Sequence, residues 1–189
     1  MNSNKAKSNA FSIVRLRSLA VTALFAALIC VLSPFSLSVS GLIPVSLASF
    51  AVLLAAGMLE PKRAVSAVAV FIFLGAVGLP VFSGFQGGLQ KLAGVTGGFI
   101  TGFLPMAFIV SFIYGRIKRK WALPLAMIAG TAVLYFFGTV WFMLQTKNPL
   151  SSALASCVLP FLAGDAAKIV AACALTFALK ERIGKTANL

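Results

Sequence analysis

Six long apolar runs alternate with short polar or glycine-rich breaks along this chain. A helix that crosses a bilayer needs roughly 20 mostly apolar residues, so each run can form most of one membrane span. The pattern predicts an all-α integral membrane protein with six transmembrane helices. The runs cover Leu19–Leu32, Ile43–Leu59, Ala64–Leu79, Gly98–Tyr114, Ala122–Leu144 and Val158–Leu179.

Composition supports a membrane protein with no room for a separate soluble domain. The 189 residues are 60% hydrophobic and include only three acidic side chains. We expect a basic N-terminal segment over residues 1–18, a six-helix substrate-binding domain over 19–180 and a tail over 181–189. Alternatively, the first run is a signal peptide whose cleavage would leave five spans.

The basic residues gather in alternate breaks, which indicates an orientation. If the N-terminus is cytoplasmic, all of the 16 Lys and Arg residues except Lys91, Lys147 and Lys168 fall in cytoplasmic segments. Cytoplasmic loops are enriched in positive charge. Both termini are therefore expected in the cytoplasm, with a glycine-rich extracellular loop between the third and fourth helices.

Charge and side-chain inventory exclude several function classes. A net charge of +13 would indicate nucleic-acid binding only if the basic residues formed one patch, whereas here they form separate short clusters beside the membrane. We therefore expect bilayer lipid, and no nucleic acid, around the chain. It contains no histidine, and its three cysteines are far apart, so neither a metal site nor a disulfide framework is expected.

Two ionisable residues lie inside the sixth run and are the strongest candidates for a binding site. Asp165 and Lys168 are three residues apart, so they share one face of a helix. If Pro160 opens that helix, they lie about 7 and 12 Å below its outer end. A charge inside a span is expensive, so the pair is expected to bind a ligand. The alternative is a mutually neutralising pair that only fixes helix packing.

The segment Pro80–Phe99, between the third and fourth spans, contains six glycines, which permit tight turns and close backbone approach to a ligand. Its phenylalanines favour a lid or a pocket wall over a simple flexible loop. It lacks the Lys-Ser/Thr pair of a Walker A motif. Gly184-Lys185-Thr186 ends like that motif, but Leu179 replaces its first glycine, so ATP binding is not expected.

In the first run, Ala23 and Ala27 form a small-xxx-small pair that suits helix packing, within the chain or against a partner.

Taken in order, the motifs of the chain resemble the BioY family, the biotin-specific S components of energy-coupling factor (ECF) transporters. The resemblance spans nearly the whole chain, although the family usually has glutamine, proline and tyrosine at Ala48, Val95 and Phe99. It rests on Ile43-Pro44-Val45, Ala51-Val52-Leu53-Leu54-Ala55, Pro61-Lys62-Arg63, Gly78-Leu79-Pro80-Val81-Phe82, Thr96-Gly97-Gly98-Phe99, Leu159-Pro160, Gly164-Asp165 and Lys168.

The resemblance implies a non-enzymatic subunit of a prokaryotic cell-membrane importer. It implies biotin as the transported ligand, no cofactor, a transmembrane scaffold (T) subunit and two ABC-type ATPase subunits as partners. Ala23 and Ala27 would then lie on the face that meets the scaffold. The ligand-binding residues it implies, together with those of the glycine-rich loop, are Gly84, Phe85, Gln86, Gly87, Thr96, Gly97, Phe99, Asp165 and Lys168.

Within this reading, two roles are open for the charged pair. Lys168 is expected to anchor the carboxylate of the ligand, while Asp165 either orients Lys168 or accepts hydrogen bonds from ureido N–H groups. Other functions also fit the sequence: an S component for another vitamin or small carboxylate, or a structural membrane subunit. An intramembrane enzyme would have to use the charged pair as acid and base, or Cys157 as a nucleophile without a histidine.

Overall fold

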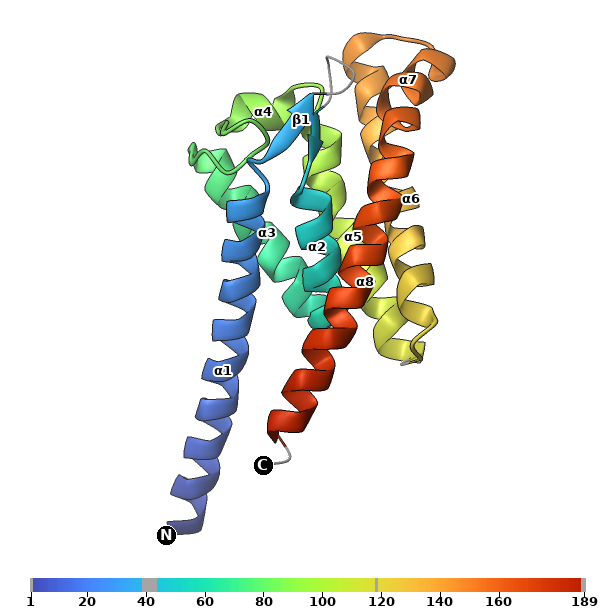
Figure 1. Ribbon diagram of the computed structural model, residues 1–189. Coiled ribbons are helices and arrows are strands. Elements are labelled where there is room, and N and C mark those ends of the chain that lie inside the picture. The colour runs from blue at the N-terminus through green and yellow to red at the C-terminus, as the bar shows by residue number, and fades with distance from the viewer. Residues whose placement is uncertain (1, 39–43, 118, 188–189) are drawn as a thin grey trace.

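The computed structural model describes residues 2–38, 44–117 and 119–187 and shows a helical bundle with a small hairpin at one end (Figure 1). Both chain termini lie at the other end, where α1 and α8 extend beyond the shorter helices. The elements in order are α1 (Asn2–Leu32), β1 (Ser36–Ser38), β2 (Pro44–Ser46), α2 (Ala48–Met58), α3 (Pro61–Val77), α4 (Leu89–Ala93), α5 (Gly97–Ile117), α6 (Ala122–Thr146), α7 (Leu150–Cys157) and α8 (Leu159–Ala187).

Each of the six predicted apolar runs overlaps one helix of 11 or more residues. In the described part of the chain, three stretches are long and apolar enough to cross a membrane: Gly97–Ile117, Ala122–Thr146 and Leu150–Arg182. Shorter apolar helices cover Leu16–Leu32 and Ala48–Met58. The prediction of a helical membrane protein is thus confirmed, and α4 and α7 are additional short helices that the hydrophobic pattern did not indicate.

The all-α prediction was wrong in one place, the antiparallel hairpin of β1 and β2. Ser36 pairs with Ser46, and Ser38 pairs with Pro44. The second run was expected to be helical from Ile43, which lies outside the described residues. Residues 44–46 pair with β1 instead of forming a first helical turn, and α2 begins only at Ala48. The Ser46 hydroxyl accepts the N–H of Ala48 at 2.8 Å and donates to the carbonyl of Ser33 at 3.1 Å.

Helix α2 forms the centre of the bundle. Nine of its 11 residues are buried. A helix that is surrounded by protein on all sides needs no polar face, which agrees with the nearly continuous apolar sequence of α2. At 1.5 Å per residue it is about 16 Å long, roughly half of the hydrocarbon core. It crosses only part of a bilayer, and other elements of the bundle surround it.

A buried apolar layer separates the hairpin end of the bundle from the terminal end. Val52, Leu53, Met106, Met127 and Ala172, from α2, α5, α6 and α8, are each at most 1% exposed. On α2 this layer separates Ser49 from Gly57, which are eight residues or about 12 Å apart along the helix. Cavities occur on both sides of the layer.

The glycine-rich segment after α3 is folded back onto the bundle. Phe82 is 1% exposed and packs edge-on against Phe71, with 5.4 Å between ring centroids. A Cβ atom at Gly75 would collide with the Phe82 ring, so glycine is needed there. Gly84 has φ 76° and donates its N–H to the carbonyl of Pro34 at 3.0 Å, which joins this turn to the end of α1.

Candidate functional site

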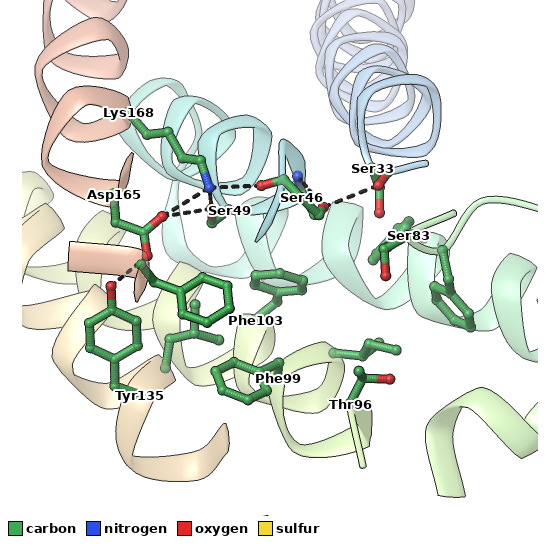
Figure 2. A pocket seen from close by; sticks show the side chains of 16 residues that line it. Ser33, Ser46, Ser49, Ser83, Thr96, Phe99, Phe103, Tyr135, Asp165 and Lys168 are labelled. Carbon is green, nitrogen blue, oxygen red and sulfur yellow. Dashed lines mark hydrogen bonds and ion pairs between the residues drawn. The ribbon is translucent and has the colours of Figure 1, made fainter. Parts of the chain in front are cut away.

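A cavity of about 70 Å³ lies between the hairpin, α2, α5, α6 and α8 (Figure 2). Its polar side is formed by Ser46, Ser49, Tyr135, Asp165 and Lys168, and its opposite wall is largely aromatic. Pockets for drug-sized ligands usually measure roughly 300 to 1,000 Å³. This pocket must therefore widen before it can enclose a vitamin-sized molecule.

Asp165 and Lys168 form an ion pair in the first turns of α8. Lys168 Nζ lies 2.9 Å from Asp165 Oδ1, and their side chains are only 12% and 8% exposed. Helix α8 begins at Leu159, with Pro160 in its first turn as expected. The sequence-based inference that this spacing brings the two side chains together is confirmed.

Neighbouring groups hold both members of the pair in place and leave one acceptor position of Asp165 Oδ2 without a partner among the described residues. Lys168 Nζ also donates to the carbonyl of Ser46 at 2.8 Å and to Ser49 Oγ at 3.0 Å, which uses all three of its N–H bonds. Ser49 approaches Asp165 Oδ1 at 3.4 Å, and the Tyr135 hydroxyl donates to Asp165 Oδ2 at 2.6 Å. The result is a fixed network with no net charge.

Tyr135 and Ser49 were missed by the sequence reasoning. Figure 2 shows the Tyr135 hydroxyl directed at Asp165 Oδ2, and Ser49 beside the contact between the two charged groups. The available signals were weak: Tyr135 is a tyrosine in the middle of an apolar helix, and Ser49 is a serine in a very apolar one. Buried hydroxyl groups need partners, so such residues point towards polar sites.

Aromatic rings form the opposite wall of the cavity. Phe99 stacks on Phe161 with 6.5 Å between ring centroids, and Phe82 and Phe103 also line the space. The position of Phe99 depends on α6, because a Cβ atom at Gly138 would overlap its ring. Thr96, also predicted as a site residue, lines the same cavity beside Phe99.

The predicted loop residues lie beside this cavity and do not line it. Gly84 and Phe85 line a neighbouring cavity of about 480 Å³, whose wall includes Lys168 and Phe35. The Phe35 and Phe85 rings meet edge-on there at 5.6 Å. Lys168 and Ser46 line both cavities and therefore separate the two spaces.

Three further predicted loop residues line neither cavity. Gln86 is exposed and accepts a hydrogen bond from Lys91 Nζ at 2.5 Å. Gly87 packs against the backbone of Gly78 and Leu79, and Gly97 packs against the carbonyl of Leu92. The absence of a side chain at these two glycines lets the backbone fold tightly there.

The predicted partner face lies far from the cavity, on α1. Ala23 and Ala27 are both exposed, one helical turn apart. They therefore do not contribute to packing inside this chain, which was one of the two interpretations of the pair. They remain available for contact with lipid or with another helix.

Comparison with known proteins gives a consistent family. The sequence model of the BioY family matches residues 3–185. The biotin transporter BioY2 of Lactococcus lactis subsp. cremoris is 34% identical over 91% of this chain and 94% of its own length. The biotin transporter BioY of Thermotoga maritima is 35% identical over 88% of this chain and 97% of its own length.

Solved structures agree with these sequence relatives. The S-component for biotin from an ECF-type ABC transporter superposes with a TM-score of 0.82 at 25% identity, covering 96% of this chain and 94% of that one. The S component of a bacterial ECF transporter shares the fold, with a TM-score of 0.62 at 15% identity over 93% of this chain and 99% of that one. The resemblance seen in the sequence is confirmed, and the chain belongs to the BioY family.

Proposed function

We propose that the protein is the biotin-binding S component of an ECF-type importer, which captures biotin outside the cell and delivers it through a complex energised by separate ATPase subunits. Its family, its biotin-transporting relatives and its fold support this function. The observation that carries it is the neutral Asp165–Lys168 pair at one side of a largely aromatic cavity. A site of this kind suits a small ligand with a polar head and an apolar body.

The ureido ring of biotin fits the charged pair better than its carboxylate does. A ureido group offers N–H donors to Asp165 and a carbonyl acceptor to Lys168, and the group itself is uncharged. The Lys168 ammonium is already balanced by Asp165 at 2.9 Å. A ligand carboxylate would therefore be a second anion on one cation. This assignment replaces our sequence-based hypothesis that Lys168 anchors the carboxylate. Titration with biotin and with its uncharged amide distinguishes the ureido assignment from the carboxylate assignment.

The remaining site residues are assigned to the body of the ligand and to the mouth of the pocket. Phe99 and Thr96 line the cavity and contact the bicyclic ring directly. Gly84, Phe85, Gln86, Gly87 and Gly97 belong to the segment around the mouth, which closes over the ligand after the pocket widens. The cavity beside Phe85 provides space for that movement.

Competition binding tests the proposed ligand. Purified protein in detergent is titrated with biotin and then with biotin in the presence of excess thiamine, riboflavin, folate or pantothenate. We expect one biotin per chain, recovered chemically unchanged, with no displacement by the other vitamins. Displacement by one of them would identify an S component for that vitamin. Chemical conversion of biotin would instead indicate an enzyme.

We propose six membrane segments, formed by α1, α2, α3, α5, α6 and α8, with both termini in the cytoplasm of a prokaryote. The domain limits are those given above: the segment over 1–18, the membrane domain over 19–180 and the tail over 181–189. The arrangement of basic residues supports this orientation. The common location of the two chain ends in Figure 1 supports it as well.

Thiol labelling tests this topology. In a variant without the three native cysteines, single cysteines at Lys91 and Lys147 are expected to react with an impermeant reagent added outside intact cells. A cysteine at Arg119 is expected to react only after the cells are opened, because that loop lies in the cytoplasm. Labelling of the Arg119 site from outside would reverse the orientation.

A further inference from the structure

A second cavity, of about 320 Å³, opens at the terminal end of the bundle, on the far side of the buried layer from the biotin site. It is lined by the junction between α2 and α3, by the last turns of α5 and by Lys180 of α8. The apolar spans Gly97–Ile117 and Leu150–Arg182 both end close to it. The cavity is therefore at the depth of the lipid headgroups, whichever leaflet that end faces.

One cation and several acceptors line this space. The Lys180 ammonium lies 4.1 Å from the centre of the Tyr114 ring, which keeps the charge at the cavity wall. Glu60, at the α2–α3 junction, has a side chain that is 74% exposed and lies 3.8 Å from Arg63, so its pairing there is weak. The carboxylate is therefore free to meet a second cation.

The end of α2 adds a further acceptor beside Glu60. In a continuing helix the carbonyl of Gly57 would accept the N–H of the residue four positions later, but that residue is Pro61, which has none. Both residues line the cavity. The end of a helix also carries partial negative charge. This side of the cavity consequently favours a group that is positively charged and donates N–H bonds.

We infer that this cavity binds the headgroup of a zwitterionic phospholipid with a primary ammonium, that is, phosphatidylethanolamine. Lys180 contacts its phosphate, and Glu60 with the Gly57 carbonyl contacts its ammonium. Phosphatidylcholine has the same charges but no N–H to donate, and phosphatidylglycerol has no cation for Glu60. Basic pockets between membrane helices commonly hold lipid headgroups, and the acidic side here adds the selectivity.

Native mass spectrometry of the full chain in detergent tests this site, with dioleoyl lipids of the three headgroups added in turn. We expect one phosphatidylethanolamine to bind at least about 10-fold more tightly than phosphatidylcholine, or roughly 1.4 kcal/mol. Glu60→Gln should abolish that preference, and Lys180→Gln should weaken the binding of all three lipids. Equal affinities of the wild type for phosphatidylethanolamine and phosphatidylcholine would overturn the inference.

Two variants serve as matched controls. Arg116 lies near the same end, 5.4 Å from the Phe112 ring, but does not line the cavity. Arg63→Gln removes the weak partner of Glu60 without removing its carboxylate. Both variants should keep the lipid preference, and biotin binding at the opposite end reports that each variant is folded. If Arg116→Gln weakens binding as much as Lys180→Gln does, the lipid is attracted by general surface charge and the proposed site is wrong.

Discussion

Lys168→Ala is expected to weaken biotin binding at least about 100-fold, which corresponds to roughly 2.8 kcal/mol. The substitution removes a donor to the ligand and also leaves Asp165, whose side chain is 8% exposed, without its cation. A buried charge that loses its partner is strongly unfavourable, and a hydrogen bond to a charged group contributes about 1.5 to 3 kcal/mol. Isothermal titration of the purified variant measures the loss, and its melting temperature in detergent shows whether the fold survives.

A matched variant and a second ligand make this result specific. Lys147→Gly removes a charge at the C-terminal cap of α6, at a position with φ 56° that suits glycine and that lines neither cavity beside Lys168, and should leave affinity unchanged. Biotin and its uncharged amide are then titrated into wild type and Lys168→Ala. If Lys168 contacts the ureido ring, both proteins discriminate acid from amide equally. If the discrimination disappears in Lys168→Ala, then Lys168 anchors the carboxylate and the ureido assignment is wrong.

Replacing both Ala23 and Ala27 with tryptophan is expected to abolish biotin uptake while changing biotin affinity less than about 2-fold. Both alanines are exposed, so the large rings disturb no packing within the chain. Small residues allow the backbones of two membrane helices to approach closely, and two indole rings would prevent that approach to the scaffold subunit. Co-purification of the scaffold and ATPase subunits, together with uptake of labelled biotin by cells, measures the effect.

The control uses another exposed strip of the same helix. Val21 and Leu24 are 38% and 68% exposed and lie on average about 110° around the helix from the alanine pair. Tryptophan at both of these positions should leave complex assembly and uptake intact, because lipid accommodates the rings. Normal assembly by the Ala23→Trp, Ala27→Trp protein would place the scaffold contact on another helix.

The helices were predictable where burial in lipid or protein requires a long apolar run. The hairpin was not, because Pro44-Val45-Ser46 joins the apolar run of α2 without a break, and a proline is also tolerated in the first turn of a helix. Helix α7 was missed for a different reason. Its eight residues, Leu150–Cys157, mix serine with alanine and leucine, so they show no long apolar run.

The charged half of the site was predictable, and the residues around it were not. Asp165 and Lys168 are expensive in a membrane, so the sequence itself marks them as candidates for a binding site. Tyr135 and Ser49 carry no such penalty, and they reach Asp165 and Lys168 from helices that lie 30 and 119 positions away along the chain. Contacts over such separations depend on how helices pack, which a single sequence does not reveal.

The buried layer between the two cavities also determines the electrical behaviour of the membrane. An ion crossing the centre of the bundle would have to leave water and pass Val52, Leu53 and Met127, which are at most 1% exposed. Moving a bare ion into such a low-dielectric medium is unfavourable by an idealised value on the order of 20 kcal/mol. We therefore expect a bilayer that contains this subunit alone to keep its resistance to ions.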